Sequence, residues 1–307
     1  MPVQLTRLAE AFCSLGYPAV EGEPMSNHTS FQIGGPADLF VTVPDGEGAA
    51  VILSACGAAG VPVLVMGNGS NLLVSDEGIE GAVMKIETAA PPYLNGEGEI
   101  VCPAGLSVKR LCLFARSQGL SGLEFAFGIP GTVGGGIFMN AGAYGGQLSD
   151  VLTRIAVVTR TGEKKFLLSD ELALGYRSSA LMRTGDVVTE ARFRLKPDDP
   201  AEIAARMETY LASRREKQPL ASPSAGSFFK RPPGNFAGTL IEACGLKGKR
   251  IGGAQISEKH AGFLINTGGA TCADVLELSR QVRDTVYRQT GVRLEPEVRA
   301  VGRGVDG

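Results

Sequence analysis

The first part of the chain alternates short apolar runs with stretches of helical periodicity. Three apolar runs have the length and composition of buried strands: 39–43, 61–67 and 81–86. Small residues at 47–59 predict a helix between the first two strands. An earlier helix is predicted by four apolar residues on one helical face: Leu5, Leu8, Phe12 and Leu15. This order predicts a small α/β unit over residues 1–95.

A second set of elements begins near residue 98. Apolar runs at 99–105, 154–160 and 186–195 predict strands, and the periodicity of 107–120 predicts a helix. The long stretch 128–146 between them is rich in glycine. We expect these elements to form an α+β unit over residues 96–200.

A third unit is predicted after a boundary helix. Residues 196–219 have an acidic start, a helical pattern and a basic end closed by proline. Four elements are then predicted in order: a helix near 236–244, a strand at 262–266, a helix that begins at Thr271 with Asp274 in a capping box, and a strand within 292–302. We assign residues 201–307 to this unit, so the fold class predicted for the chain is α+β.

Charge and apolar content narrow the choice of partners. The chain has 30 basic and 32 acidic side chains, so no overall field favours nucleic acid or an anionic membrane. No apolar stretch approaches the ~20 residues that cross a bilayer, and the N-terminus does not resemble a signal peptide. We therefore expect a small-molecule partner and no nucleic acid or membrane.

Cysteine spacing indicates a reducing compartment. The six cysteines are scattered and include no C-x-x-C pair, which is typical of reduced core thiols and not of a metal site. We expect a cytoplasmic monomer that holds no metal.

Glycine is the unusual component, with 42 residues that cluster and do not repeat. The segments "MGNGSNLLV" (66–74) and "GIPGTVGGGIFMNAGAYGG" (128–146) can turn successive backbone N–H groups toward phosphate oxygens, so a nucleotide is the natural ligand. Leu72 replaces the third glycine of a Rossmann fingerprint, and neither segment has the lysine and hydroxyl of a P-loop.

These segments, with "TSFQIGGPADLFV" (29–41), resemble the FAD-binding segments of vanillyl-alcohol oxidase/cresol methylhydroxylase flavoproteins. Among these, the chain is similar to the UDP-N-acetylmuramate dehydrogenase family, also called UDP-N-acetylenolpyruvoylglucosamine reductases. The resemblance implies a two-part FAD-binding domain and a C-terminal α+β substrate-binding domain. By position, it implies flavin contacts from these residues: Gly67, Asn68, Gly69, Ser70, Asn71, Leu72, Gly128, Ile129, Pro130, Gly131, Thr132, Gly135, Asn140 and Ala141.

The resemblance also implies a reaction in peptidoglycan precursor synthesis and three catalytic residues. These are Arg177 in "GYRSS", Ser227 in "AGSFFKRP" and Glu297 in "LEPEVR". In the family, NADPH reduces FAD, flavin N5 delivers hydride to the enolpyruvyl terminal carbon of the UDP-sugar, and a serine protonates the adjacent carbon. Arg177 suits the developing carboxylate charge, and we expect Glu297 to be protonated so that it donates a hydrogen bond. Ser227 matches the proton donor, with Lys230 nearby to stabilise the alkoxide.

Substrate contacts are implied for Lys230, Arg231 and His260. Only fifty positions separate Arg177 from Ser227, which resembles the shorter class of the family without a tyrosine-bearing loop. Two alternatives stay open at this point: another FAD-dependent alcohol or phenol oxidoreductase, and a non-catalytic nucleotide-binding module. The first leaves the catalytic trio unexplained, and the second predicts a protein that NADPH cannot bleach.

Overall fold

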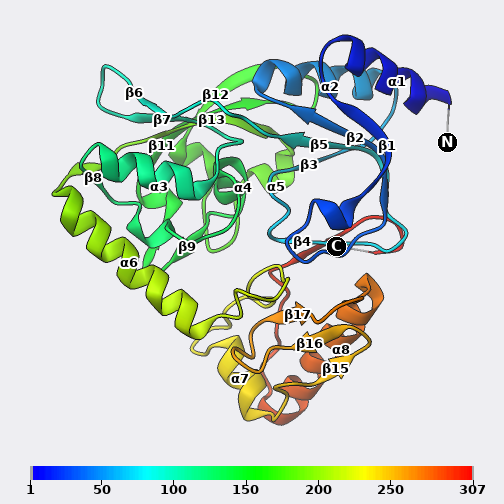
Figure 1. Cartoon of the computed structure of the whole chain (residues 1–307), viewed down its shortest axis with the longest axis vertical. Helices are drawn as coiled ribbons and strands as arrows, with labels where there is room; N and C mark the ends of the chain where they lie inside the picture. Colours follow the sequence, from blue (N-terminus) through cyan, green and yellow to red (C-terminus); the bar gives the residue numbers. More distant parts are fainter. Residues whose placement is uncertain (1–2, 306–307) are drawn as a thin grey trace. The chain divides into compact units, whose positions relative to one another are not determined.

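The computed structural model describes residues 3–305 and consists of two compact units (Figure 1). Unit 1 comprises three chain segments: 3–21, 39–68 and 81–213. Unit 2 comprises the remaining segments: 22–38, 69–80 and 214–305. Both units are therefore discontinuous in sequence. The expected division at residues 95 and 200 into three domains stays a prediction about subdomains.

The first sheet of unit 1 has the strand order β1-β2-β5-β3, with β3 parallel to β5. Helices α1 and α2 lie on the same side of this sheet (Figure 1). The buried side chains of Phe12, Val41 and Ile52 belong to one core cluster and come from α1, β2 and α2. The bounds are α1 Val3–Ser14, β1 Ala19–Pro24, β2 Pro36–Val43, α2 Gly46–Ala58, β3 Val63–Met66 and β5 Ile79–Ile86.

These elements confirm the predicted strands and helices, with one correction at the end of α1. Leu15 is exposed because the helix ends at Ser14 and no longer carries it on the apolar face. The start of α2 is fixed by Asp45, whose side chain accepts a hydrogen bond from the backbone N–H of Gly48 at 3.0 Å.

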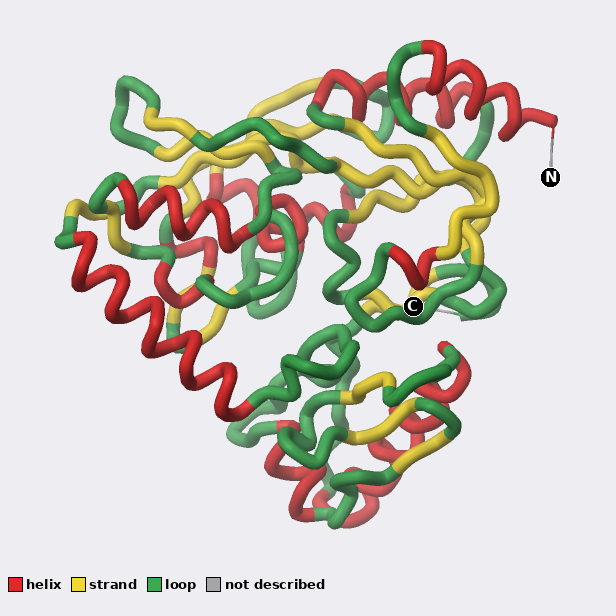
Figure 2. The backbone as a smooth tube through the Cα atoms, in the orientation of Figure 1, coloured by secondary structure: helices red, strands yellow, loops and turns green. Residues whose placement is uncertain are grey.

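The second sheet of unit 1 has five antiparallel strands in the order β12-β11-β13-β7-β6. The tube in Figure 2 shows helical segments beside this sheet. Its core cluster includes Ile100, Ile155 and Phe193 from three strands and Leu111 from α3, all essentially buried. The bounds are β6 Tyr93–Leu94, β7 Ile100–Pro103, α3 Val108–Ser117, β8 Leu120–Ser121, α4 Val133–Phe138, β9 Gly142–Ala143, β10 Gly146–Gln147, β11 Leu152–Val158, β12 Lys164–Leu168, α5 Leu181–Thr184, β13 Val187–Phe193, β14 Lys196–Pro197 and α6 Pro200–Lys217.

Unit 2 packs two helices against short strands around a third core cluster. The helix predicted from Thr271 is α8, and its capping box is present, because Thr271 and Asp274 each bond the other's backbone N–H at 3.0 Å. The bounds are β4 Leu72–Val74, α7 Ala237–Ala243, β15 Arg250–Ile251, β16 Ala254–Ile256, β17 Leu264–Asn266, α8 Cys272–Thr290 and β18 Arg299–Val301.

The strand predicted within 292–302 is much shorter than the apolar pattern suggested. Only Arg299–Val301 forms β18, which runs parallel to β4. Pro296 has no N–H to donate, and the neighbouring Glu297 instead bonds the carbonyl of Phe228. Residues 292–298 therefore form an irregular segment and not a strand.

The described cysteines are all free thiols. Four are buried, as expected for core thiols: Cys56, Cys102, Cys112 and Cys272. Cys244 is half-buried, and Cys13 is exposed near the end of α1, so the prediction of core thiols is wrong for Cys13.

Candidate functional site

Arg177 lies on a tight turn in unit 1. The turn is closed by two backbone hydrogen bonds between Gly175 and Ser178, with N···O distances of 3.1 and 3.3 Å. Arg177 has φ of +53°, in the left-handed region that favours glycine or asparagine at this turn position. A bulky residue held in this conformation is typical of a functional site, because other contacts must offset the strain.

The contacts that hold the Arg177 guanidinium are backbone carbonyls of the glycine-rich segment. Nη2 donates to the carbonyl of Gly142 at 3.0 Å, and Nη1 donates to the carbonyl of Asn140 at 3.4 Å. The ring of Tyr176 lies 5.2 Å from the guanidinium carbon. These contacts orient the guanidinium, whose planar fork of N–H donors matches the geometry of a carboxylate.

Ser227 lies in unit 2 on an extended segment that is bonded on both sides. The N–H of Phe228 donates to the carbonyl of Gly262 at 2.8 Å, and the N–H of Glu297 donates to the carbonyl of Phe228 at 2.8 Å. Phe228 and Phe229 are each only 3% exposed and belong to the core cluster, whereas Ser227 is exposed. The aromatic pair therefore anchors the segment and leaves the serine hydroxyl accessible. The structure thus brings the chain segments of Ser227 and Glu297 together.

The first glycine turn is connected to Glu297 within unit 2. Asn71 donates its side-chain amide to the carbonyl of Glu297 at 3.2 Å, and its own carbonyl accepts from the N–H of Arg299 at 3.0 Å. The parallel pairing of β4 with β18 continues this contact. Asn71, predicted as a flavin contact, therefore also fixes the backbone that carries Glu297.

The glycine segments fit the flavin nucleotide that the sequence predicts. A Cβ on Gly67 would lie 2.2 Å from Oγ1 of Thr132, so the two predicted segments approach closely within unit 1. A Cβ on Gly69 would lie 2.2 Å from the carbonyl of His28 in unit 2. Gly131 has φ of +125°, which L side chains rarely adopt. Gly67 is required because a side chain would meet Thr132, and Gly69 and Gly131 are required by their backbone conformation, as at the positions of a phosphate cradle built from N–H groups.

Two of the predicted flavin contacts have side chains that face the protein. Thr132 is 4% exposed and caps α4 by accepting from the N–H of Gly135. Asn140 is 1% exposed and its side chain hydrogen-bonds only within unit 1 among the contacts described here. Asn68, Pro130 and Gly135 are exposed, Gly69 is buried, and the other predicted contacts are half-buried.

The three predicted substrate contacts lie in unit 2 in different electrostatic settings. The Lys230 ammonium is 3.4 Å from a carboxylate oxygen of Glu295, and both groups are partly exposed. The Arg231 guanidinium lies 3.9 Å from the ring centre of Phe236.

His260 differs from the two cations. Burial lowers the pKa of His260, and its Nδ1 accepts a hydrogen bond from the N–H of Gly262 at 3.1 Å. A neutral ring with its proton on Nε2 can donate a hydrogen bond to a substrate oxygen.

Sequence reasoning missed several residues that contact Asn140 or Arg177. Gln147 and Ser149 bond Asn140, and Gly142 supplies a carbonyl to Arg177. They lie inside or next to the glycine-rich segment, but no single-sequence signal separates them from ordinary turn residues. Tyr176 was visible in "GYRSS", and its ring contact with Arg177 is the added information.

Two negative findings apply to the residues that the structure describes. Within 3–305, no three His, Cys, Asp or Glu side chains gather into a group that could hold a metal ion. Over the same range, every helix is too short or too polar to cross a membrane.

Comparison with family models identifies both halves of the chain. Residues 37–165 match the FAD binding domain, and residues 218–301 match the C-terminal domain of UDP-N-acetylenolpyruvoylglucosamine reductase. The first match confirms the predicted FAD-binding fold. The second confirms the type of domain predicted for the C-terminal part.

Several relatives are similar over almost the whole chain. UDP-N-acetylenolpyruvoylglucosamine reductase of Geobacillus kaustophilus is 48% identical and covers 91% of this chain and 92% of its own. The enzyme of Lachnoclostridium phytofermentans is 46% identical, with coverage of 92% and 93%. The crystal structure of the enzyme from Thermus caldophilus has 37% identity and a TM-score of 0.78, and covers 92% of this chain and 98% of its own.

Proposed function

This chain belongs to the UDP-N-acetylenolpyruvoylglucosamine reductase family, and we propose that Arg177, Ser227 and Glu297 carry out its reaction on the enolpyruvyl group. The chain is an FAD-dependent reductase of peptidoglycan precursor synthesis, as predicted. The FAD-binding domain confirms the predicted cofactor, and NADPH is the reductant of this class of enzyme. The two alternative functions are thereby rejected.

One observation supports the catalytic proposal more strongly than the other observations do. The 2.8 Å hydrogen bond from the Glu297 N–H to the Phe228 carbonyl joins two motifs that are about seventy residues apart in sequence. It fixes Glu297 beside the segment whose exposed residue is Ser227. A proton donor and a second polar group are thus held on one rigid backbone frame, which pre-organises them for charge that develops during reaction.

The three side chains have different roles in the proposal. FAD, which the glycine segments 66–74 and 128–146 would hold, would supply hydride to the terminal carbon of the enolpyruvyl group. Arg177 binds the carboxylate of this group and stabilises negative charge as it spreads onto it. Glu297, protonated, donates a hydrogen bond to the same developing anion. Ser227 gives its hydroxyl proton to the neighbouring carbon, and Lys230 stabilises the oxygen that remains.

The variant Ser227→Ala tests the proton-donor role. We expect reduction of the flavin by NADPH to stay within about twofold of the wild-type rate. Oxidation of the reduced flavin by the UDP-sugar should slow by roughly 10²–10⁴-fold, the usual contribution of a positioned acid. Stopped-flow absorbance of the flavin measures both half-reactions, and Lys230→Met should slow the second by about tenfold.

Ser222→Ala is the matched control, because it removes a hydroxyl from the same region of unit 2 without touching the proposed site. Equal slowing of both half-reactions in Ser227→Ala would show that the serine holds the cofactor and does not donate the proton. Unchanged kinetics would remove Ser227 from the reaction altogether.

We also propose that the enzyme acts as a cytoplasmic monomer on a UDP-sugar. Four buried free thiols support a reducing compartment. The basic Lys230 and Arg231 support an anionic sugar nucleotide as the ligand of unit 2. Analytical ultracentrifugation of the FAD-loaded protein tests the monomer; a stable dimer at micromolar concentration would contradict it.

A further inference from the structure

We infer that Asn140 is a positioning residue for Arg177, acting through the Gly175–Ser178 turn, and that its side chain is not a flavin ligand. The inference rests on the proposed role of Arg177. Its starting point is burial: Asn140 is 1% exposed, so its amide has no open side from which to reach a cofactor.

The hydrogen bonds of the Asn140 amide account for its donors and its acceptor. Nδ2 lies 3.1 Å from the carbonyl of Gly175 and 3.3 Å from side-chain oxygens of both Gln147 and Ser149. Oδ1 accepts from the N–H of Ser149 at 3.0 Å. An amide used in this way by the protein is a structural link, because leaving such a buried group unpaired is costly.

Asn140 reaches the Arg177 turn by two routes. Its side chain bonds the carbonyl of Gly175, which closes the turn with Ser178. Its own carbonyl accepts from Nη1 of Arg177. One residue therefore fixes both the backbone at the base of the turn and the head group of the arginine.

The backbone conformation of Arg177 explains why the bond from Asn140 to Gly175 is needed. Asn140 and Arg177 have φ of +42° and +53°, both in the left-handed region. Asparagine tolerates this region and arginine does so poorly. The arginine turn therefore needs outside support to stay in place, and the bond from Nδ2 to Gly175 supplies it.

The decisive variant is Asn140→Gly, which keeps the left-handed backbone accessible and removes the side chain that carries the amide. We expect oxidation of the flavin by the UDP-sugar to slow by roughly 10–100-fold, since displacement of a catalytic group by about 1 Å costs up to 10²-fold. Reduction by NADPH, FAD content and the visible spectrum should stay near wild type. In steady state, kcat should fall more than KM rises, because Arg177 acts on charge that develops in the transition state.

Three comparisons separate positioning from general damage. In an Arg177→Ala background, Asn140→Gly should add less than about a twofold effect, because its partner is already absent. Ser149→Ala, which spares the bond to Gly175, should stay within about twofold of wild type. Hydrogen exchange of the FAD-loaded protein without substrate should accelerate over residues 174–179 in Asn140→Gly and not in Ser149→Ala.

The possible failures are distinguishable. Loss of FAD, slower reduction by NADPH, or a fully additive effect with Arg177→Ala would overturn the positioning role of Asn140. If the UDP-sugar oxidises the reduced flavin of Arg177→Ala at the wild-type rate, the proposed role of Arg177 is wrong, and the inference about Asn140 is wrong with it. Should Asn140→Gly not fold, Asn140→Asp keeps the shape and the acceptor while removing the donor, and the same outcomes apply.

Discussion

Glu297 is a single residue whose position is fixed by hydrogen bonds to its backbone. It is half-buried, and its N–H and carbonyl are both hydrogen-bonded, to the carbonyl of Phe228 and the side-chain amide of Asn71. A carboxylate beside the substrate carboxylate would be repelled, so the role proposed for Glu297 requires a proton on it. A glutamine, which donates a hydrogen bond without charge, is the natural mimic of that state.

We therefore expect Glu297→Gln to retain most of the activity that Glu297→Ala loses. The alanine variant should slow flavin oxidation by the UDP-sugar by roughly 10²–10³-fold, the usual effect of removing one donor to a developing anion. The glutamine variant should lose about tenfold or less in the same stopped-flow measurement. Equal damage in both variants would mean that the negative charge of Glu297 is needed. Glu258→Gln, an exposed carboxylate of the same unit, is the control.

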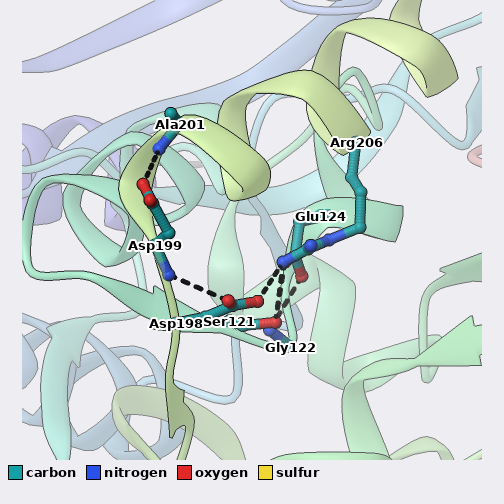
Figure 3. Close-up of polar contacts among 7 residues, drawn as sticks. All are labelled: Ser121, Gly122, Glu124, Asp198, Asp199, Ala201 and Arg206. Atoms are coloured by element: carbon teal, nitrogen blue, oxygen red, sulfur yellow. Dashed lines mark hydrogen bonds and ion pairs between the residues drawn. The ribbon is translucent and has the colours of Figure 1, made fainter.

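At the scale of elements, α6 is fastened to unit 1 by a clasp of charged side chains (Figure 3). Arg206 of α6 donates to Glu124 at 2.8 Å and to Asp198 at 2.5 Å. Glu124 is 7% exposed and also accepts from the N–H of Gly122 at 2.7 Å and from the hydroxyl of Ser121 at 2.8 Å. Each oxygen of the buried carboxylate is therefore satisfied.

Burial by itself would raise the pKa of Glu124, but the hydrogen bonds from Arg206, Gly122 and Ser121 prevail and hold it below the ordinary value of 4.5. A lowered pKa means that the unfolded chain binds the proton more readily. The clasp thus stabilises the fold fully above about pH 4.5, and this contribution is lost as the pH falls through the lower, folded pKa.

Glu124→Gln should lower the free energy of unfolding by about 1.5–3 kcal/mol at pH 7, the range for hydrogen bonds to charged groups. Urea denaturation followed by circular dichroism measures this difference, which should shrink as the pH falls below 4.5. Asp198→Asn, on the exposed side of the clasp, should cost less. An equal loss in both variants, or a difference that does not shrink as the pH is lowered below 4.5, would contradict this role of Glu124.

At the scale of the whole molecule, the reactivity of the buried cysteines shows whether each unit is folded. Burial raises the pKa of Cys56 to about 11 and that of Cys272 to about 12, so these thiols stay protonated and inert in the native protein. Cys56 lies in unit 1 and Cys272 in unit 2. Cys13 is the exposed thiol.

Mass spectrometry after brief maleimide treatment should therefore show fast labelling at Cys13, slower labelling at Cys244 and protection of the other four. In rising urea, labelling of Cys56 and Cys272 should report the opening of units 1 and 2 separately. Rapid labelling of Cys272 in native buffer would contradict the burial described for unit 2.

Much of the fold follows from local pattern, and its limits have physical causes. The strands of the first sheet and the capping box at Thr271 depend on neighbours in sequence, so they were predictable. The discontinuous make-up of the two units was not, because pairing of Leu72–Val74 with Arg299–Val301 depends on tertiary contact that leaves no periodic signal. The final strand was predicted too long for the same reason, because only the three residues that pair with β4 form a strand.

The sequence predicted the candidate catalytic residues of the site, but not the residues that hold them in position. Arg177, Ser227 and Glu297 were found by resemblance, and their roles stay predictions. The links from Asn71 to Glu297 and from Asn140 to Gly175 were missed, since an asparagine in a glycine-rich stretch also suits a turn or a phosphate contact. The neutral state of His260 depends on burial and on the Gly262 N–H, which no sequence pattern reveals.

The bond between Asn71 and Glu297 joins residues 226 positions apart, and this has a consequence for biosynthesis. The loop that it closes is long, so its formation costs chain entropy that local contacts cannot offset. While the protein is being translated, the turn after Gly69 has no partner strand until residues 299–301 leave the ribosome. The nascent chain must therefore carry an unfinished glycine turn while all the residues between Gly69 and Arg299 are synthesised, and unit 2 is completed only after them.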